Sequence, residues 1–227
     1  GFIGSGNMGR AIMGGMIAAG LYTPSQILAS ARTKETVEKI EKELGIVATT
    51  DNATVAKKAD ILFLAVKPGV FATVIPEIRD CCKEGQIVVS IAAGQTLTSI
   101  TEMFGHEIKL VRAMPNTPAL VGEAMSAVTP NNHVGEEEIQ DVMAIFESFG
   151  KAEIVPETMM DAVIGVSGSS PAYVYMFIEA MADAAVADGM PRKQAYKFAA
   201  QSVLGAAKMV LETGCLLYTS PSPRDCS

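Results

Sequence analysis

The feature that most constrains the fold is an alternation of short apolar segments with amphipathic ones through the first two thirds of the chain. The segment 60–66 (DILFLAV) is apolar throughout after its first residue, which is typical of a parallel strand buried on both faces of a sheet. Strands that alternate with helices indicate a doubly wound α/β fold. We therefore expect a mainly parallel sheet, with strands at residues 1–4, 26–30, 46–49, 60–66, 86–92, 108–114, 124–130 and 151–156.

The last third of the chain shows only helical patterns, at residues 158–166, 171–188 and 191–213. The helix at 171–188 is apolar on almost every face, and two further helices give it too little cover. We therefore expect this helix to pack against another subunit.

The change of pattern near Pro156 predicts the domain organisation. We expect an α/β domain at residues 1–156 and an all-helical dimerisation domain at residues 157–214, which would be incomplete. Residues 215–227 change composition abruptly and have no period of their own, so we expect them to be a non-native tail.

A glycine motif, Gly4-Ser5-Gly6-Asn7-Met8-Gly9, lies where the first strand is expected to give way to a helix. Gly4 permits a tight turn, Gly6 lets a pyrophosphate approach the backbone, and Gly9 lets the helix pack closely on the strand. The N-terminus of that helix would offer free N–H groups and the positive end of its dipole to the phosphates. In this setting the motif predicts a Rossmann-type dinucleotide-binding domain.

The choice between NADP and NAD depends on the end of the second strand, where NAD enzymes usually carry an acidic residue. This chain has small residues followed by Arg32 at that point, and a guanidinium group can pair with a 2′-phosphate. The alternative is that Arg32 is only a solvated charge of the loop. We therefore expect NADP (NADPH) as the cofactor, with NAD as the alternative.

Three further strand ends lie on the side of the sheet where open α/β folds bind ligands. Lys67 follows the fourth strand and is either an exposed lysine or a contact to the nicotinamide half of the cofactor. Residues 90–94 (SIAAG) are small and leave room for a flat ring. Asn116 follows the sixth strand and is framed by two prolines that stiffen its turn.

Charge and cysteine content exclude several classes of partner. A net charge of −7 and a pI near 4.9 argue against nucleic acids and anionic membranes. No apolar run is long enough to span a membrane, and no cysteine or histidine spacing fits a metal site. Four cysteines without such spacing favour a reducing, cytoplasmic setting.

Six motifs together resemble the pyrroline-5-carboxylate reductase family: GFIGSGNMG, LFLAVKP, SIAAG, MPNTP, SGSSPAYVY and LGAAKM. The resemblance runs in order from Gly1 to Gly214. It implies a Rossmann domain followed by a helical domain that interleaves with its twin in a homodimer, often assembled into a ring of dimers. It also implies NADPH-dependent reduction of 1-pyrroline-5-carboxylate to L-proline, the last step of proline biosynthesis.

The resemblance also assigns binding residues, which share positions at strand ends and in glycine or serine turns. The cofactor contacts that it implies are Ile3, Gly4, Ser5, Gly6, Asn7, Met8, Gly9, Ala31, Arg32, Asn52, Ala65, Val66, Lys67, Pro68, Ala92 and Ala93. The substrate-binding residues that it implies are Ser167, Gly168, Ser169, Ser170 and Pro171.

The segment Ser167–Pro171 is expected to interrupt the helical pattern. Pro171 suits a first helical turn, Ser169 or Ser170 suits the N-cap, and the N–H groups around them would then be free to bind an anion. Given the resemblance, that anion is the substrate carboxylate. The alternative is an ordinary cap between two helices.

The sequence offers no evident catalytic acid, since His106 and His133 lie in polar, surface-like stretches. The expected reaction needs none, because the substrate is an imine that accepts hydride once it is protonated. One rival is a β-hydroxyacid dehydrogenase-like enzyme, but the helix after the second glycine and serine segment lacks the lysine those enzymes use. The other is a catalytically silent NADP-binding module, because the family's substrate-holding threonine after Gly214 has no counterpart here.

Overall fold

The computed structural model describes residues 1–214, and the expected non-native tail at 215–227 lies outside the described residues. The chain divides into two compact units, Gly1–Ser169 and a second unit that starts at Ser170. The first unit therefore extends beyond the predicted boundary at Pro156, because the helical turns up to Ser169 pack with the α/β domain. No helix among the described residues has the length and apolar character needed to cross a membrane.

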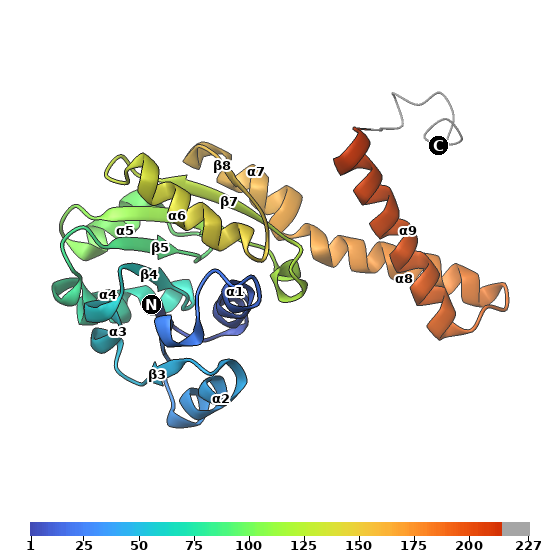
Figure 1. Ribbon diagram of the computed structural model, residues 1–227. Helices are drawn as coiled ribbons and strands as arrows, with labels where there is room; N and C mark the ends of the chain where they lie inside the picture. Colours follow the sequence, from blue (N-terminus) through green and yellow to red (C-terminus); the bar gives the residue numbers. More distant parts are fainter. Residues whose placement is uncertain (215–227) are drawn as a thin grey trace. The chain divides into compact units, whose positions relative to one another are not determined.

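The first unit is built on one eight-stranded sheet with the order β3-β2-β1-β4-β5-β6-β7-β8 (Figure 1). Its strands overlap the eight predicted segments; they are β1 (Phe2–Ile3), β2 (Leu28–Ser30), β3 (Val47–Thr49), β4 (Ile61–Leu64), β5 (Ile87–Ser90), β6 (Lys109–Met114), β7 (Ala124–Pro130) and β8 (Gly150–Ile154). Every neighbouring pair is parallel except β6 and β7, which are antiparallel. The predicted fold class, a Rossmann-type and mainly parallel sheet, is confirmed.

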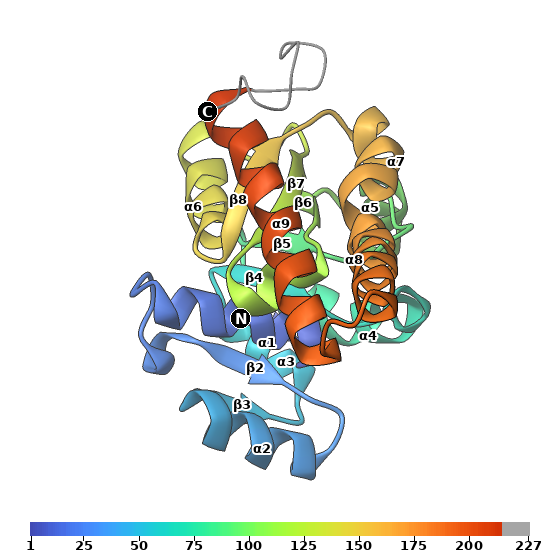
Figure 2. The ribbon, with the colours of Figure 1, turned by 90° about the vertical axis from the view of Figure 1, so that its right-hand side faces the viewer.

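Helices cover both faces of this sheet, as a doubly wound fold requires. On one face α1, α2 and α6 contribute to a single apolar cluster with the strands, and on the other face α3, α4 and α5 contribute to a second cluster. Figure 2 shows α6 and α5 on opposite sides of the strands β5–β8. The helices are α1 (Asn7–Ala18), α2 (Lys34–Leu44), α3 (Asn52–Lys58), α4 (Phe71–Ile78), α5 (Leu97–Phe104) and α6 (Glu136–Glu147).

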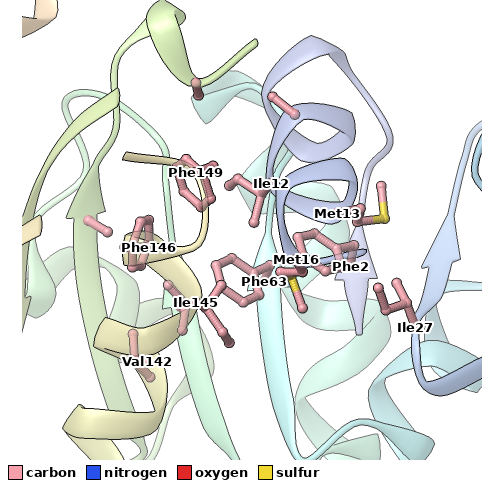
Figure 3. Packing of buried hydrophobic residues seen from close by; sticks show 14 of the residues in the cluster. Phe2, Ile12, Met13, Met16, Ile27, Phe63, Val142, Ile145, Phe146 and Phe149 are labelled. Carbon is pink, nitrogen blue, oxygen red and sulfur yellow. The ribbon is translucent and has the colours of Figure 1, made fainter. Parts of the chain in front are cut away.

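Aromatic rings form the centre of the cluster that involves α1 and α6 (Figure 3). Phe63 of β4 stacks on Phe2 of β1, with ring centroids 4.6 Å apart, and lies 6.0 Å from the ring of Phe146. Phe149 continues the row, with its centroid 5.7 Å from that of Phe146. These buried rings fix α1, and therefore the turn that precedes it, against the middle of the sheet.

The stretch that follows β8 differs from the sequence prediction of one helix at 158–166. It consists of a 3₁₀ turn at Glu157–Met159, the short helix α7 (Met160–Val163) and a π-helical turn at Ile164–Gly168. The predicted N-cap at Ser169 or Ser170 is wrong, because the backbone of Ser169 is helical (φ −94°, ψ −23°) and Ser170 already lies inside α8 (Ser170–Ala187). Its N–H donates to the carbonyl oxygen of Ile164 at 2.9 Å, so the helical path is widened rather than broken.

The second unit contains α8 (Ser170–Ala187) and α9 (Arg192–Thr213), which pack against each other through small residues. Its buried cluster consists of Ala182, Ala195 and Ala199 alone among the described residues. Large apolar side chains remain exposed on both helices, including Tyr173, Tyr175, Met176, Phe177, Phe198, Leu204 and Leu211. Exposed apolar side chains in this number are typical of a subunit interface.

Candidate active site

The sheet brings the carboxyl ends of β1, β4, β5 and β6 to one edge. The register pairs Ile3 with Leu64, Leu64 with Ser90, and Ser90 with Arg112, so the loops that follow these strands emerge side by side. Ligands of open α/β sheets bind at this edge, at the point where the strand order reverses, which here lies between β1 and β4. The predicted residues at 4–9, 65–68 and 92–93 are therefore neighbours in space.

The glycine turn between β1 and α1 has the geometry that the sequence predicts. Gly4 has φ +97°, and a Cβ atom there would lie 2.7 Å from Cγ1 of Val66 and 2.8 Å from the carbonyl oxygen of Ala65. A Cβ atom on Gly9 would lie 3.0 Å from the carbonyl oxygen of Gly4. These two glycines are thus required by the protein's own packing.

Gly6 is different, because a Cβ atom on it would meet no protein atom within 4 Å. It is the N-cap of α1, its backbone is extended (φ −70°, ψ −174°), and it provides no side-chain cap for the first N–H groups of the helix. The first turn of α1 carries no acidic residue. An open space beside uncapped N–H groups fits a pyrophosphate, so the residues present fit a dinucleotide.

Ser5 and Ser30 join the glycine turn to the end of β2. The Ser5 hydroxyl is buried and donates to the carbonyl oxygen of Ser30 at 2.8 Å, and the N–H of Gly4 donates to the same oxygen at 3.2 Å. The Ser30 hydroxyl donates to Oδ1 of Asn52 at 2.7 Å. Nδ2 of Asn52 in turn donates to Oε2 of Glu77 at 2.7 Å. The predicted residue Asn52 is therefore held in one orientation by two partners, neither of which the sequence indicated.

Two cationic side chains at this edge, Arg32 and Lys67, are exposed and form no hydrogen bond or ion pair with any of residues 1–214. Arg32 follows β2 after the buried residue Ala31, and Lys67 follows β4. Neither guanidinium nor ammonium group is neutralised by the protein, so both are available to phosphate groups. An exposed arginine without a protein partner fits both readings of Arg32, as a ligand for a 2′-phosphate and as a solvated charge of the loop.

The remaining predicted cofactor residues differ in how far their side chains can reach a ligand. Ile3 and Ala92 are buried, Met8, Ala65, Val66 and Pro68 are half-buried, and Asn7 and Ala93 are exposed. Met8 packs against the core cluster of α1, and Val66 packs against the cluster on the opposite face of the sheet. These two side chains therefore serve the packing of the protein as well as lining the predicted site.

Two buried polar residues near this edge have partners that the sequence did not indicate, and one of the two, Arg112, was not among the expected site residues. Asn116 donates from Nδ2 to the carbonyl oxygen of Ser167 at 3.0 Å and accepts at Oδ1 from the N–H of Met125 at 2.9 Å. Arg112, whose side chain is 9% exposed, donates to Oε1 of Glu157 at 2.9 Å. An arginine inside an apolar strand was the available signal for the second residue, since a buried charge needs a partner.

The two histidines lie away from this edge. His133 is exposed, and its Nε2 lies 2.9 Å from Oε2 of Glu107. His106 is also exposed and lies edge-on to the ring of Phe104. Neither is placed to donate a proton at the ends of β1, β4 or β5.

The two described cysteines lie near the amino end of β5, opposite the candidate site. Cys82 is partly buried, and this burial raises the pKa of its thiol to about 11, so the thiol stays protonated at neutral pH. We expect the double variant Cys81→Ser, Cys82→Ser to retain kcat and KM within about twofold, since thiolate character is what makes a cysteine reactive. A large loss of kcat in a variant with an unchanged Tm would contradict this expectation.

Taken together, the parallel sheet, the glycine turn and the uncapped helix define an NADP-binding oxidoreductase with a Rossmann domain. Residues 1–94 match the family described as NADP oxidoreductase, coenzyme F420-dependent, and residues 157–222 match the family described as pyrroline-5-carboxylate reductase dimerisation. The chain belongs to the pyrroline-5-carboxylate reductase family. Enzymes of this family reduce 1-pyrroline-5-carboxylate to L-proline with NAD(P)H, the last step of proline biosynthesis.

Curated relatives and solved structures agree on this family. The pyrroline-5-carboxylate reductase of Escherichia coli (strain K12) is 56% identical over 214 residues, which cover 94% of this chain and 80% of that protein. The structure of a pyrroline-5-carboxylate reductase from Coxiella burnetii is similar with a TM-score of 0.90 and 33% identity, covering 99% of this chain and 86% of that one. The Plasmodium falciparum pyrroline carboxylate reductase with NADP bound is similar with a TM-score of 0.85 and 31% identity, covering 99% and 80%.

Proposed function

We propose that NADPH binds along the carboxyl edge of the sheet, through the residues predicted from the sequence. The single observation that supports this most strongly is the space around Gly6, which the protein itself does not fill. The uncapped N–H groups of α1 would bind the pyrophosphate, Arg32 the 2′-phosphate, and the small residues Ala92 and Ala93 would leave room for the nicotinamide ring.

The substrate carboxylate would be bound by the segment Ser167–Pro171, as the sequence suggested. The predicted N-cap is absent at both Ser169 and Ser170, but the π-helical turn Ile164–Gly168 supplies a different argument. Widened helical turns of this kind occur frequently at functional sites. Ser167 and Gly168 also lie against the end of β6, next to the strands that carry the predicted nicotinamide contacts.

In the proposed reaction, reduced nicotinamide supplies a hydride to the imine carbon, and a proton from solvent is held on the imine nitrogen. L-proline and NADP⁺ are the products. The chain contributes by binding: it fixes the carboxylate of the substrate and limits the orientations of the imine carbon. Orientation of this kind can account for a large part of a rate enhancement without any catalytic side chain.

We expect Arg32→Ala to raise the Kd for NADPH about tenfold to a hundredfold, since a charge-assisted hydrogen bond contributes about 1.5–3 kcal/mol. The Kd for NADH should change less than about twofold, because NADH lacks the 2′-phosphate that the guanidinium binds. Fluorescence titration of both cofactors against both proteins measures this directly. Equal affinities for NADPH and NADH in the wild-type protein would contradict the assignment of NADP.

We also propose that two copies associate through α8 and α9, whose exposed apolar side chains would then be buried. Assembly of such dimers into a ring and a cytoplasmic location are part of the same proposal. The matched dimerisation family supports the association of subunits, and the free thiols of Cys81 and Cys82 suit a reducing compartment. Sedimentation of the purified protein across a range of concentrations tests the dimer and the ring.

A further inference from the structure

Asn116 connects three segments of the first unit through its side-chain amide. It follows β6, it donates to Ser167 in the π-helical turn, and it accepts from the backbone of Met125 in β7. The residue is only 8% exposed, so water cannot easily replace either bond. Because its donor and its acceptor are both used, the amide has one favourable orientation.

A second contact also packs the π-helical turn against the end of β6. A Cβ atom on Gly168 would lie 3.4 Å from Cε of Met114, the last residue of β6. The hydrogen bond from Asn116 thus fixes the carbonyl of Ser167 at a site where the adjacent glycine allows close approach. The π-helical turn cannot move along the sheet edge without breaking this bond.

We infer that Asn116 is a positioning residue for substrate binding, acting through Ser167. It sets the position of the segment Ser167–Pro171 that would hold the substrate carboxylate, and thereby the distance from the imine carbon to the cofactor at the carboxyl edge of the sheet. The inference rests on the proposed role of Ser167–Pro171. Misplacement of a bound substrate by about 1 Å can reduce a rate about a hundredfold, so a single buried amide can matter without touching the substrate.

Asn131 provides a matched control at the opposite end of the same strand pair. Its Nδ2 donates to the carbonyl oxygen of Ile108 at 2.8 Å, and its Oδ1 accepts from the N–H groups of Leu110 and His133, both at 3.2 Å. Asn131→Ala removes a comparable set of bonds between side chain and backbone. This substitution should lower the stability of the protein about as much as Asn116→Ala does. Asn131, however, lies away from the carboxyl edge of the sheet.

The kinetic experiment compares the wild-type protein with Asn116→Ala, Asn116→Asp and Asn131→Ala. The Asp variant keeps the acceptor for Met125 but places a carboxylate oxygen against the carbonyl of Ser167. We expect both Asn116 variants to raise KM for 1-pyrroline-5-carboxylate about tenfold or more, with the Kd for NADPH changed less than about twofold. Asn131→Ala should leave KM unchanged. An increase in KM for Asn116→Ala no larger than that for Asn131→Ala would overturn the inference.

Hydrogen exchange of a peptide that covers residues 164–169 tests the positioning without any need for turnover. Asn116→Ala should accelerate exchange in this peptide, including at the Ser169 amide, while Asn131→Ala should not. If the wild-type protein reduced no pyrroline-5-carboxylate, the proposed function would fail while this measurement still decided the positioning role. Unchanged exchange in the Asn116→Ala protein would show that the side chain does not hold the turn.

Discussion

Gly6→Ala is expected to raise the Kd for NADPH about a hundredfold or more while leaving the fold intact. The added methyl group meets no protein atom within 4 Å, so the packing of the turn does not require a glycine. It would occupy the space where the pyrophosphate approaches the backbone and would displace the phosphates by more than about 1 Å. The expected decrease in the free energy of unfolding is less than about 1 kcal/mol, the difference between glycine and alanine at an N-cap.

Two other glycines provide controls for this experiment. Gly14 lies within α1, and an added Cβ atom would lie 3.8 Å from Cδ2 of Leu44, so Gly14→Ala should leave NADPH binding unchanged. Gly4→Ala should lower the Tm as well as the affinity, because Gly4 has φ +97° and a Cβ atom there would contact the Ala65 backbone. An unchanged Kd for NADPH in the Gly6→Ala protein would contradict the proposed cofactor site.

Phe63→Ala is expected to lower the free energy of unfolding by about 3–5 kcal/mol, the usual cost of removing a buried phenylalanine ring. The ring is 1% exposed and lies between those of Phe2 and Phe146 (Figure 3). Because domains of this kind are stable by only about 5–15 kcal/mol, this loss is a large part of the total. Urea denaturation followed by circular dichroism measures it.

Val47→Ala is the control for the phenylalanine variant, since Val47 is 56% exposed on the edge strand β3. The free energy of unfolding of the Val47→Ala protein should differ from that of the wild-type protein by less than about 0.5 kcal/mol, as is usual for surface positions. A similar small change for Phe63→Ala would mean that the aromatic row does not support the sheet beneath the glycine turn.

The strands and the glycine turn could be predicted because local signals determine them. The apolar run at 60–66 is as long as a buried strand, and it contains β4 (Ile61–Leu64). The positive φ of Gly4 follows from the spacing of the glycine motif after β1. In such segments the sequence pattern and the tertiary structure favour the same conformation.

The segment around Ser169 could not be predicted in the same way. Serine before proline is a typical helix start, and this local preference indicated an N-cap. The helical path instead continues through a π-helical turn, whose Ser167 carbonyl is bound by Asn116 from a distant part of the sequence. The partners of Arg112 and Asn52 were missed for the same reason, because only the folded chain brings them together.

The central claim is that this chain reduces 1-pyrroline-5-carboxylate with NADPH at the carboxyl edge of its sheet. The most direct test is to follow NADPH oxidation and proline formation together, in the wild-type and Gly6→Ala proteins. We expect the wild-type protein to form one L-proline for each NADPH that it oxidises. At saturating 1-pyrroline-5-carboxylate, the KM for NADPH should be much higher for the Gly6→Ala protein than for the wild-type protein. Binding of NADPH by the wild-type protein without formation of L-proline would contradict the claim.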